Sequence, residues 1–240
     1  MPTVKNPAAL KKAYEAALPK VKSNDFPTTM VVGGHTLFRA INPLSPYSML
    51  PKPAAGAAVS LAATVPLLQP GDIGREGNNR FTGPSYNPGI QPIGGLYCVL
   101  QQQALVNELT HYSGKAAAWA VSGKCILRVR VKATITVADI SPHHSHGMRF
   151  LRSLGPKVWD QMNDPDDCSV ARGIGLAFAT ARFLHGMSVQ TVRESERSAE
   201  ERGDNLVLFS TAGPVQGVEV DKVYYFGKTS TPEAFAVTRP

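Results

Sequence analysis

Hydrophobic and polar residues alternate most regularly within residues 125–140, CILRVRVKATITVADI. A period of two places successive side chains on opposite faces of a strand. The segment therefore predicts one long, half-buried strand. Its inner face would carry Val129, Val131, Ala133, Ile135 and Val137, and its outer face Arg128, Arg130, Lys132, Thr134 and Thr136.

Apolar residues at helical spacing predict three helices. The first covers residues 7–18 (PAALKKAYEAAL), with Pro7 near its start and Pro19 at its end. The second covers residues 102–112, and the third covers residues 168–184, with Gly186 as the C-terminal stop. The GIG sequence at 173–175 lies inside the third helix, so its glycines favour close helix packing rather than phosphate binding.

Shorter apolar runs predict the remaining strands. Residues 29–40 predict a hairpin that turns at Gly33-Gly34 and carries Arg39 on its second strand. Residues 42–87 are rich in Pro, Gly, Ser and Ala, and predict a long loop with one helix at 54–63. Further strands are predicted at 96–100, 188–193, 205–210 and 217–226.

Helices and strands follow one another in an irregular order, which predicts a single α+β domain with largely antiparallel sheets and flanking helices. We expect residues 1–34 to form an N-terminal helical extension. Residues 35–240 would form the main domain, with a Pro/Gly-rich insertion at about 42–92.

Composition narrows the partners. The 240-residue chain is 43% hydrophobic and has a formal net charge of +7, with its positive residues scattered. Without a basic stripe to follow phosphates, nucleic acid is disfavoured as a partner. The three cysteines are widely spaced, which predicts free thiols in a reducing cytoplasm rather than a disulfide or a zinc site.

The first residues lack the apolar core of a secretory signal, and no apolar run is long enough to span a membrane. We therefore expect a cytoplasmic protein, although delivery into another cell by a signal-independent machine would leave no trace in the sequence. His143, His144 and His146 are predicted to lie in a turn without a fourth ligand, so no metal is expected.

A set of short motifs resembles the RES domain, a family of bacterial NAD-degrading toxins named for an arginine, a glutamate and a serine. Tyr97 and Glu108 have the eleven-residue spacing of the family's Leu-Tyr strand and following helical glutamate. The motifs cover about residues 35–212 and comprise LFRA (37–40), GNNRF (77–81), GGLYCVLQQQALVNELTHY (94–112), VADIS (137–141), RESER (193–197) and GDNLVLF (203–209).

The resemblance implies a fold related to ADP-ribosyltransferase toxins. It also implies cleavage of NAD, as substrate rather than cofactor, by phosphorolysis or hydrolysis, and neutralisation by a cognate antitoxin or immunity protein. It assigns catalytic roles to Arg39, Glu108 and Ser195, and NAD binding to Arg39, Arg80 and Tyr97. Ser198 competes with Ser195 for the serine position.

The chemistry of NAD cleavage suits these residue types. Departure of nicotinamide leaves an oxocarbenium-like ribose, which a carboxylate such as Glu108 would stabilise. Arginine forks bind a diphosphate well. Each residue also has an ordinary alternative: a solvated glutamate, ion pairs at the surface for the arginines, a core tyrosine, and a serine in a charged loop. A protein ADP-ribosyltransferase and a non-enzymatic interaction module remain the alternative functions.

Overall fold

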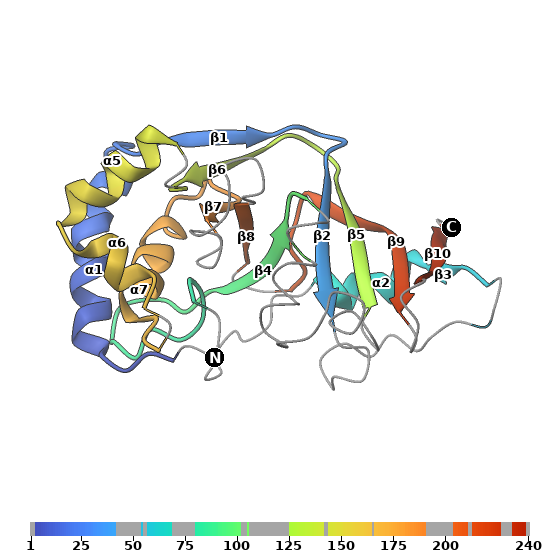
Figure 1. The fold of residues 1–240 in the computed structure, drawn as a ribbon, viewed down its shortest axis with the longest axis horizontal. Coiled ribbons are helices and arrows are strands. Elements are labelled where there is room, and N and C mark those ends of the chain that lie inside the picture. Colours follow the sequence, from blue (N-terminus) through green and yellow to red (C-terminus); the bar gives the residue numbers. More distant parts are fainter. Residues whose placement is uncertain are drawn as a thin grey trace.

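The computed structural model combines one long, curled sheet with a group of helices at one end (Figure 1). This confirms the predicted α+β class and its largely antiparallel strands. Among the described residues, no helix is long and apolar enough to cross a membrane. The described residues are 3–41, 54, 57–68, 80–101, 105, 125–141, 144–164, 166–190, 204–210, 213–226 and 232–238.

Ten strands of the described residues form the sheet in the order β1-β6-β7-β8-β4-β2-β5-β9-β10-β3. All neighbouring strands in this order are antiparallel except β6–β7 and β10–β3. Their bounds are β1 Thr28–Val31, β2 Thr36–Ile41, β3 Val59–Ser60, β4 Gly94–Val99, β5 Cys125–Val131, β6 Ile135–Asp139, β7 Gly186–Gln190, β8 Asp204–Ser210, β9 Val218–Phe226 and β10 Pro232–Thr238.

Four of the helices, α1, α5, α6 and α7, gather against one face of β6, β7 and β8, whereas α2 lies beside β9 and β3 (Figure 1). Helix α7 lies between this face and α1, and both of its internal glycines allow close contact. A Cβ on Gly173 would lie 2.3 Å from the Leu10 carbonyl oxygen, and one on Gly175 would lie 2.0 Å from that of Phe81. The packing role predicted for GIG is confirmed. The helix bounds are α1 Pro7–Lys22, α2 Leu61–Thr64, a 3-10 turn Val65–Leu68, α5 Ser145–Leu154, α6 Val158–Met162 and α7 Ser169–Phe178.

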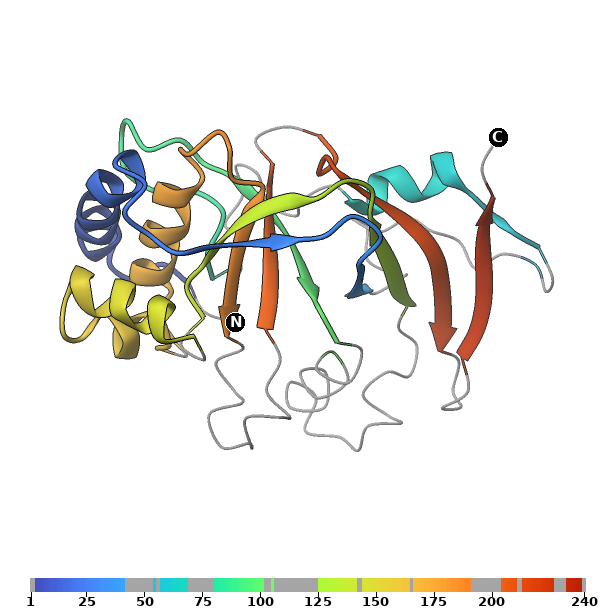
Figure 2. The same cartoon turned by 90° about the horizontal axis from the view of Figure 1, so that it is seen from above.

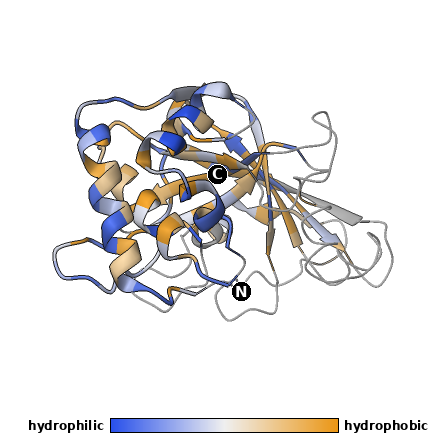
Figure 3. Ribbon diagram, turned by 60° about the vertical axis from the view of Figure 1, so that its left-hand side comes forward, coloured by the Kyte–Doolittle hydropathy of each residue, from blue (hydrophilic) through white to orange (hydrophobic). Residues whose placement is uncertain are grey.

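We call the opposite face of the sheet the inner face. It is concave and buries the largest apolar cluster of the described residues. It receives residues from both halves of the sheet, among them Leu37, Leu96, Leu127, Val137 and Leu208. The outer face of β2, β4 and β5 packs a smaller cluster with Phe38, Val99 and Ile126. In Figure 3 the strands are mostly apolar in colour, whereas the helices alternate between apolar and polar residues.

The predicted hairpin at 29–40 and the single strand at 125–140 are both wrong, for one shared reason. The chain does turn at Gly33-Gly34, where Gly34 has φ +90°. However, β1 pairs with β6 and β2 pairs with β5, and not with each other. Residues 28–41 and residues 125–139 therefore run side by side and change direction at the same place, which forms a corner of the sheet. The amide of Gly34 donates to the Val131 carbonyl (2.7 Å) across this corner. The alternation of inner and outer residues on β5 and β6 is nevertheless as predicted.

Three further predictions need correction. The helix predicted at 168–184 ends at Phe178, and Gly186 lies in β7, where a Cβ would lie 2.2 Å from the Val207 carbonyl oxygen. The helix predicted at 54–63 begins only at Leu61, because the Ser60 hydroxyl caps it by accepting from the Ala63 amide. His146 lies in α5 rather than in a turn. The predicted strands at 96–100, 188–193, 205–210 and 217–226 correspond to β4, β7, β8 and β9.

Candidate functional site

A single row of side chains crosses the inner face of the sheet from β6 to β9. Directly paired residues of neighbouring strands point to the same face, so the strand registers define the row. Asp139 of β6 lies beside Ser188 of β7, which lies beside Leu206 of β8. The row continues through Cys98, Arg39, Leu127 and Val223.

This row lies close to one edge of the sheet. The last residues of β2, β4 and β7 and the first residues of β5 and β8 meet at this edge, which is the lower edge in Figure 2. The face itself is apolar, and its polar side chains in the row and beside it come from Arg39, Asp139, Ser188 and Asp204. Polar groups thus concentrate where the apolar inner face reaches the edge.

Arg39 is half-buried, and its Nε atom is fully buried. Its neighbours across the sheet are Cys98 and Leu127. Burial raises the pKa of the Cys98 thiol to about 12, while the positive charge of Arg39 acts in the opposite direction. The Arg39 side chain therefore lies beside apolar residues of the inner face.

Asp139 is the centre of a hydrogen-bonded network at the same edge. Its Oδ2 lies 2.7 Å from Nδ1 of His144, and its Oδ1 accepts from the Ser141 amide at 3.3 Å. The Ser141 hydroxyl donates to Oδ1 of Asp204 at 2.7 Å. Asp139 and Ser141 are buried, whereas the His144 side chain is 53% exposed. The network thus joins two carboxylates through Ser141 and leaves one imidazole facing solvent.

Tyr97 and Arg80 lie on the other side of β4 from Arg39. The Tyr97 hydroxyl accepts from the Phe81 amide at 2.8 Å, and burial raises its pKa to about 12. Nη1 of Arg80 donates to the carbonyls of Met162 (2.7 Å) and Asp164 (2.9 Å) at the end of α6. The structure therefore brings Tyr97 and Arg80 to the helical side, and Arg39 to the inner face.

Glu108, Ser195 and Ser198 lie outside the described residues, as does most of the helix predicted at 102–112. The described residues that precede and follow them in the sequence lie at one edge of the sheet. β4 ends at Val99, which pairs with Asn205 of β8, and β7 ends at Gln190, which pairs with Asp204. The described residues that flank Glu108 and Ser195 in the sequence, at the end of β4, the start of β5, the end of β7 and the start of β8, therefore lie at the edge that carries Arg39 and Asp139.

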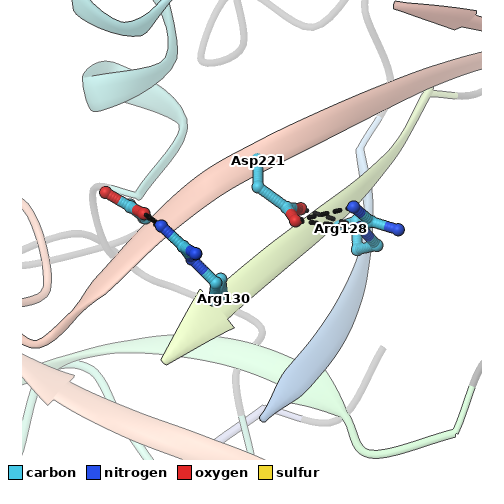
Figure 4. Close-up of polar contacts among 4 residues, drawn as sticks. Arg128, Arg130 and Asp221 are labelled. Atoms are coloured by element: carbon cyan, nitrogen blue, oxygen red, sulfur yellow. Dashed lines mark hydrogen bonds and ion pairs between the residues drawn. The ribbon is translucent and has the colours of Figure 1, made fainter. Parts of the chain in front are cut away.

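Two further arginines, Arg128 and Arg130, lie on the outer face and are neutralised across the β5–β9 pair (Figure 4). Arg128 makes a two-pronged contact with Asp221, with Nε to Oδ1 at 2.9 Å and Nη2 to Oδ2 at 2.8 Å. Asp221 is the extra residue of a β-bulge, because Arg128 opposes Lys222 while Val129 opposes Val220. Arg130 binds Glu219, with its Nε and Nη2 atoms both donating to Oε1.

No protein-family model, curated protein or solved structure matches the chain. The comparisons therefore add nothing to the resemblance derived from the motifs. Among the described residues, no group of histidine, cysteine and carboxylate side chains is arranged to hold a metal ion.

The Asp139 network was not predicted as part of a site. VADIS and GDNLVLF were noted as motifs, and each contains one of its carboxylates, Asp139 and Asp204. A charged residue at the end of an apolar strand was the available signal. What the sequence does not reveal is that the last residue of β6 and the first residue of β8 lie at the same edge, separated only by β7.

Proposed function

We propose that this protein cleaves the bond between nicotinamide and ribose in NAD and acts as a toxin by depleting NAD, with an ADP-ribosyltransferase-like fold. One observation supports this above all. Arg39 lies on an apolar inner face, in one row with Asp139, at the edge that also holds the described residues flanking Glu108 and Ser195 in the sequence. Such an edge offers an apolar wall with a few polar groups, as small-molecule sites commonly do.

The proposed roles follow from charge. Glu108 stabilises the positive ribose as nicotinamide leaves. Arg39 contacts the diphosphate, since a guanidinium carries five donors and can hold a protein group and a phosphate oxygen together. Ser195, or Ser198 three residues later, donates a hydrogen bond to the ribose or to Glu108.

Arg80 and Tyr97 keep their proposed roles in binding NAD, but from the opposite side of β4. Their contacts with the α6 carbonyls and the Phe81 amide also hold the segment at 80–81 against the helices. We propose that the protein acts in the cytoplasm and is restrained by a cognate antitoxin or immunity protein.

Incubation of the purified protein with NAD alone tests the proposal. Nicotinamide should be released without any acceptor protein. Glu108→Gln should retain the fold and lose about a hundredfold or more in turnover, the usual effect of losing one transition-state contact. Ser195→Ala should be slower than Ser198→Ala.

Each other outcome favours a different function. Nicotinamide release only when an acceptor protein is present would indicate a protein ADP-ribosyltransferase. No turnover under either condition would indicate a non-enzymatic interaction module.

A further inference from the structure

The Asp139–His144 pair is the described group best suited to move a proton. Nδ1 of His144 lies 2.7 Å from Oδ2 of Asp139. A carboxylate in this position keeps the proton on Nδ1 and leaves the lone pair on Nε2 free to accept another. The ring is 53% exposed, whereas the Asp139 side chain is 12% exposed. The basic nitrogen is therefore accessible, and the group that orients it is protected.

The pair is fixed by rigid elements. Asp139 is the last residue of β6, and its other oxygen accepts from the Ser141 amide. Helix α5 begins directly after His144 and packs against the backbone at Ser141, two residues after Asp139. A Cβ on Gly147 would lie 2.2 Å from the Ser141 carbonyl oxygen, so only glycine permits this contact. The imidazole is thus held in place before any ligand arrives, as a proton acceptor must be.

The pair also belongs to the edge described above. The Ser141 hydroxyl connects it to Asp204 of β8, and the next residue, Asn205, pairs with Val99 of β4. Asp139 shares its row and its face with Arg39, four strands away. At about 4.8 Å per strand this is roughly 19 Å along the sheet, and the sheet is curled around this face.

We infer that His144 is the general base that activates water for attack on the ribose of NAD, with Asp139 as its positioning residue; this rests on the proposed cleavage of NAD. The water oxygen forms a bond to the ribose carbon as the bond from that carbon to the nicotinamide nitrogen breaks. The bonding electron pair moves to that nitrogen, which leaves as neutral nicotinamide. The water proton passes to Nε2 of His144 and then to solvent.

The inference also identifies the acceptor. Neutral water is a poor nucleophile until a base removes its proton. Inorganic phosphate is already an anion at neutral pH and does not need this help. A positioned base therefore indicates hydrolysis, with ADP-ribose as the product, rather than phosphorolysis.

The test compares His144→Ala, His144→Asn and the matched control His146→Ala, all in the full chain. His146 is exposed on α5 and makes no polar contact with another described residue. Removing a general base typically lowers kcat by about 100-fold or more, so His144→Ala should show this loss with little change in KM. Added imidazole should restore part of its activity. His146→Ala should stay within about twofold of wild type, with or without imidazole.

His144→Asn distinguishes the loss of the base from the loss of the hydrogen bond to Asp139. Its amide can still donate to Asp139, but it cannot accept a proton, so it should be as slow as His144→Ala while melting like the wild type. Reactions run with and without inorganic phosphate should yield only ADP-ribose.

Four results would overturn the inference. If the wild type cleaves NAD and His144→Asn is fully active, His144 is not the base. The same holds if added imidazole does not restore activity to His144→Ala. In both cases the cleavage of NAD itself is unaffected. A phosphorylated ADP-ribose product would exclude water as the acceptor. No NAD cleavage by the wild-type protein would overturn the proposed function as well.

Discussion

The charged residues on the two faces of the sheet are paired differently. On the outer face, Arg128 and Arg130 each pair with a carboxylate on the neighbouring strand β9, so their charges cancel within the protein (Figure 4). On the inner face, Arg39 and Asp139 occupy the same row but are separated by three strands. Asp139 is instead bound to an exposed imidazole and lies near a second carboxylate, Asp204.

This difference separates charges that are paired across two strands from a carboxylate–imidazole pair that is available for chemistry. A partly exposed salt bridge contributes little to stability, and its charges are already paired with each other. A carboxylate that is buried, hydrogen-bonded and in contact with an accessible imidazole can control where a proton lies. The comparison therefore predicts large functional effects on the inner face and small effects of any kind on the outer face.

The largest effect is expected from Asp139→Asn. The asparagine oxygen can still accept from the Ser141 amide, but its amide would donate to Nδ1 of His144. The imidazole proton would then move to Nε2, where no lone pair would remain to accept a proton. NAD turnover should fall about 100-fold or more, with little change in KM. A steady-state kinetic comparison at equal thermal stability tests this, and unchanged kcat would detach Asp139 from the chemistry.

The next largest effect concerns NAD affinity. Arg39→Ala removes a charged hydrogen-bonding group worth about 1.5–3 kcal/mol, which corresponds to roughly a 10- to 100-fold weaker Kd. Calorimetric titration with NAD measures the change. The same Kd in wild type and Arg39→Ala would place the diphosphate elsewhere.

Arg80→Ala is the contrasting variant for this titration. It loses the hydrogen bonds to the Met162 and Asp164 carbonyls, so urea unfolding should show lower stability. Its Kd for NAD shows whether Arg80 also contributes to binding from the opposite side of β4.

Alkaline pH should lower the free energy of unfolding, because two cysteines of the inner face are buried as neutral thiols. Burial raises the pKa of Cys98 and of Cys125 to about 12, whereas an unfolded cysteine has a pKa of about 8.5. Below the unfolded value both thiols are protonated in both states, and their contribution to stability is complete. As the pH rises toward 12, the unfolded chain releases these protons first. Stability should therefore fall by up to about 1.4 kcal/mol per pH unit for each thiol.

Urea unfolding at a series of pH values measures this slope. Cys98→Ala and Cys125→Ala should each make the slope shallower. Slopes equal to that of the wild type would show that the thiols do not control the alkaline loss.

The smallest effect is expected on the outer face. Asp221→Asn and Glu219→Gln each remove one partly exposed ion pair, which should cost about 1 kcal/mol or less and leave NAD turnover unchanged. Urea unfolding at low and high salt tests the stability. A loss of turnover in either variant would show that the outer face takes part in the reaction.

Local patterns in the sequence were sufficient to predict much of the fold. The alternation around Arg128 and Val129 places each side chain on its observed face, because one face of β5 is buried along its length. The close packing of Gly173 and Gly175 also followed from their position inside an apolar helix. Both features depend on neighbours in sequence.

Features that depend on the path of the whole chain were missed. The break at Lys132–Thr134 and the turn at Gly33-Gly34 form one corner of the curled sheet, which neither segment reveals alone. For the same reason, the sequence does not reveal that Arg39 and Arg80 lie on opposite sides of β4. The contact between Asp139 and Asp204 through Ser141 likewise depends on strands distant in sequence.

The most direct test of the account is the reaction of the purified protein with NAD in water labelled with heavy oxygen. Mass spectrometry would follow nicotinamide and the ribose-containing product together. The account predicts equal amounts of nicotinamide and ADP-ribose, with the heavy oxygen incorporated into the ADP-ribose. Intact NAD after prolonged incubation with folded protein would contradict it.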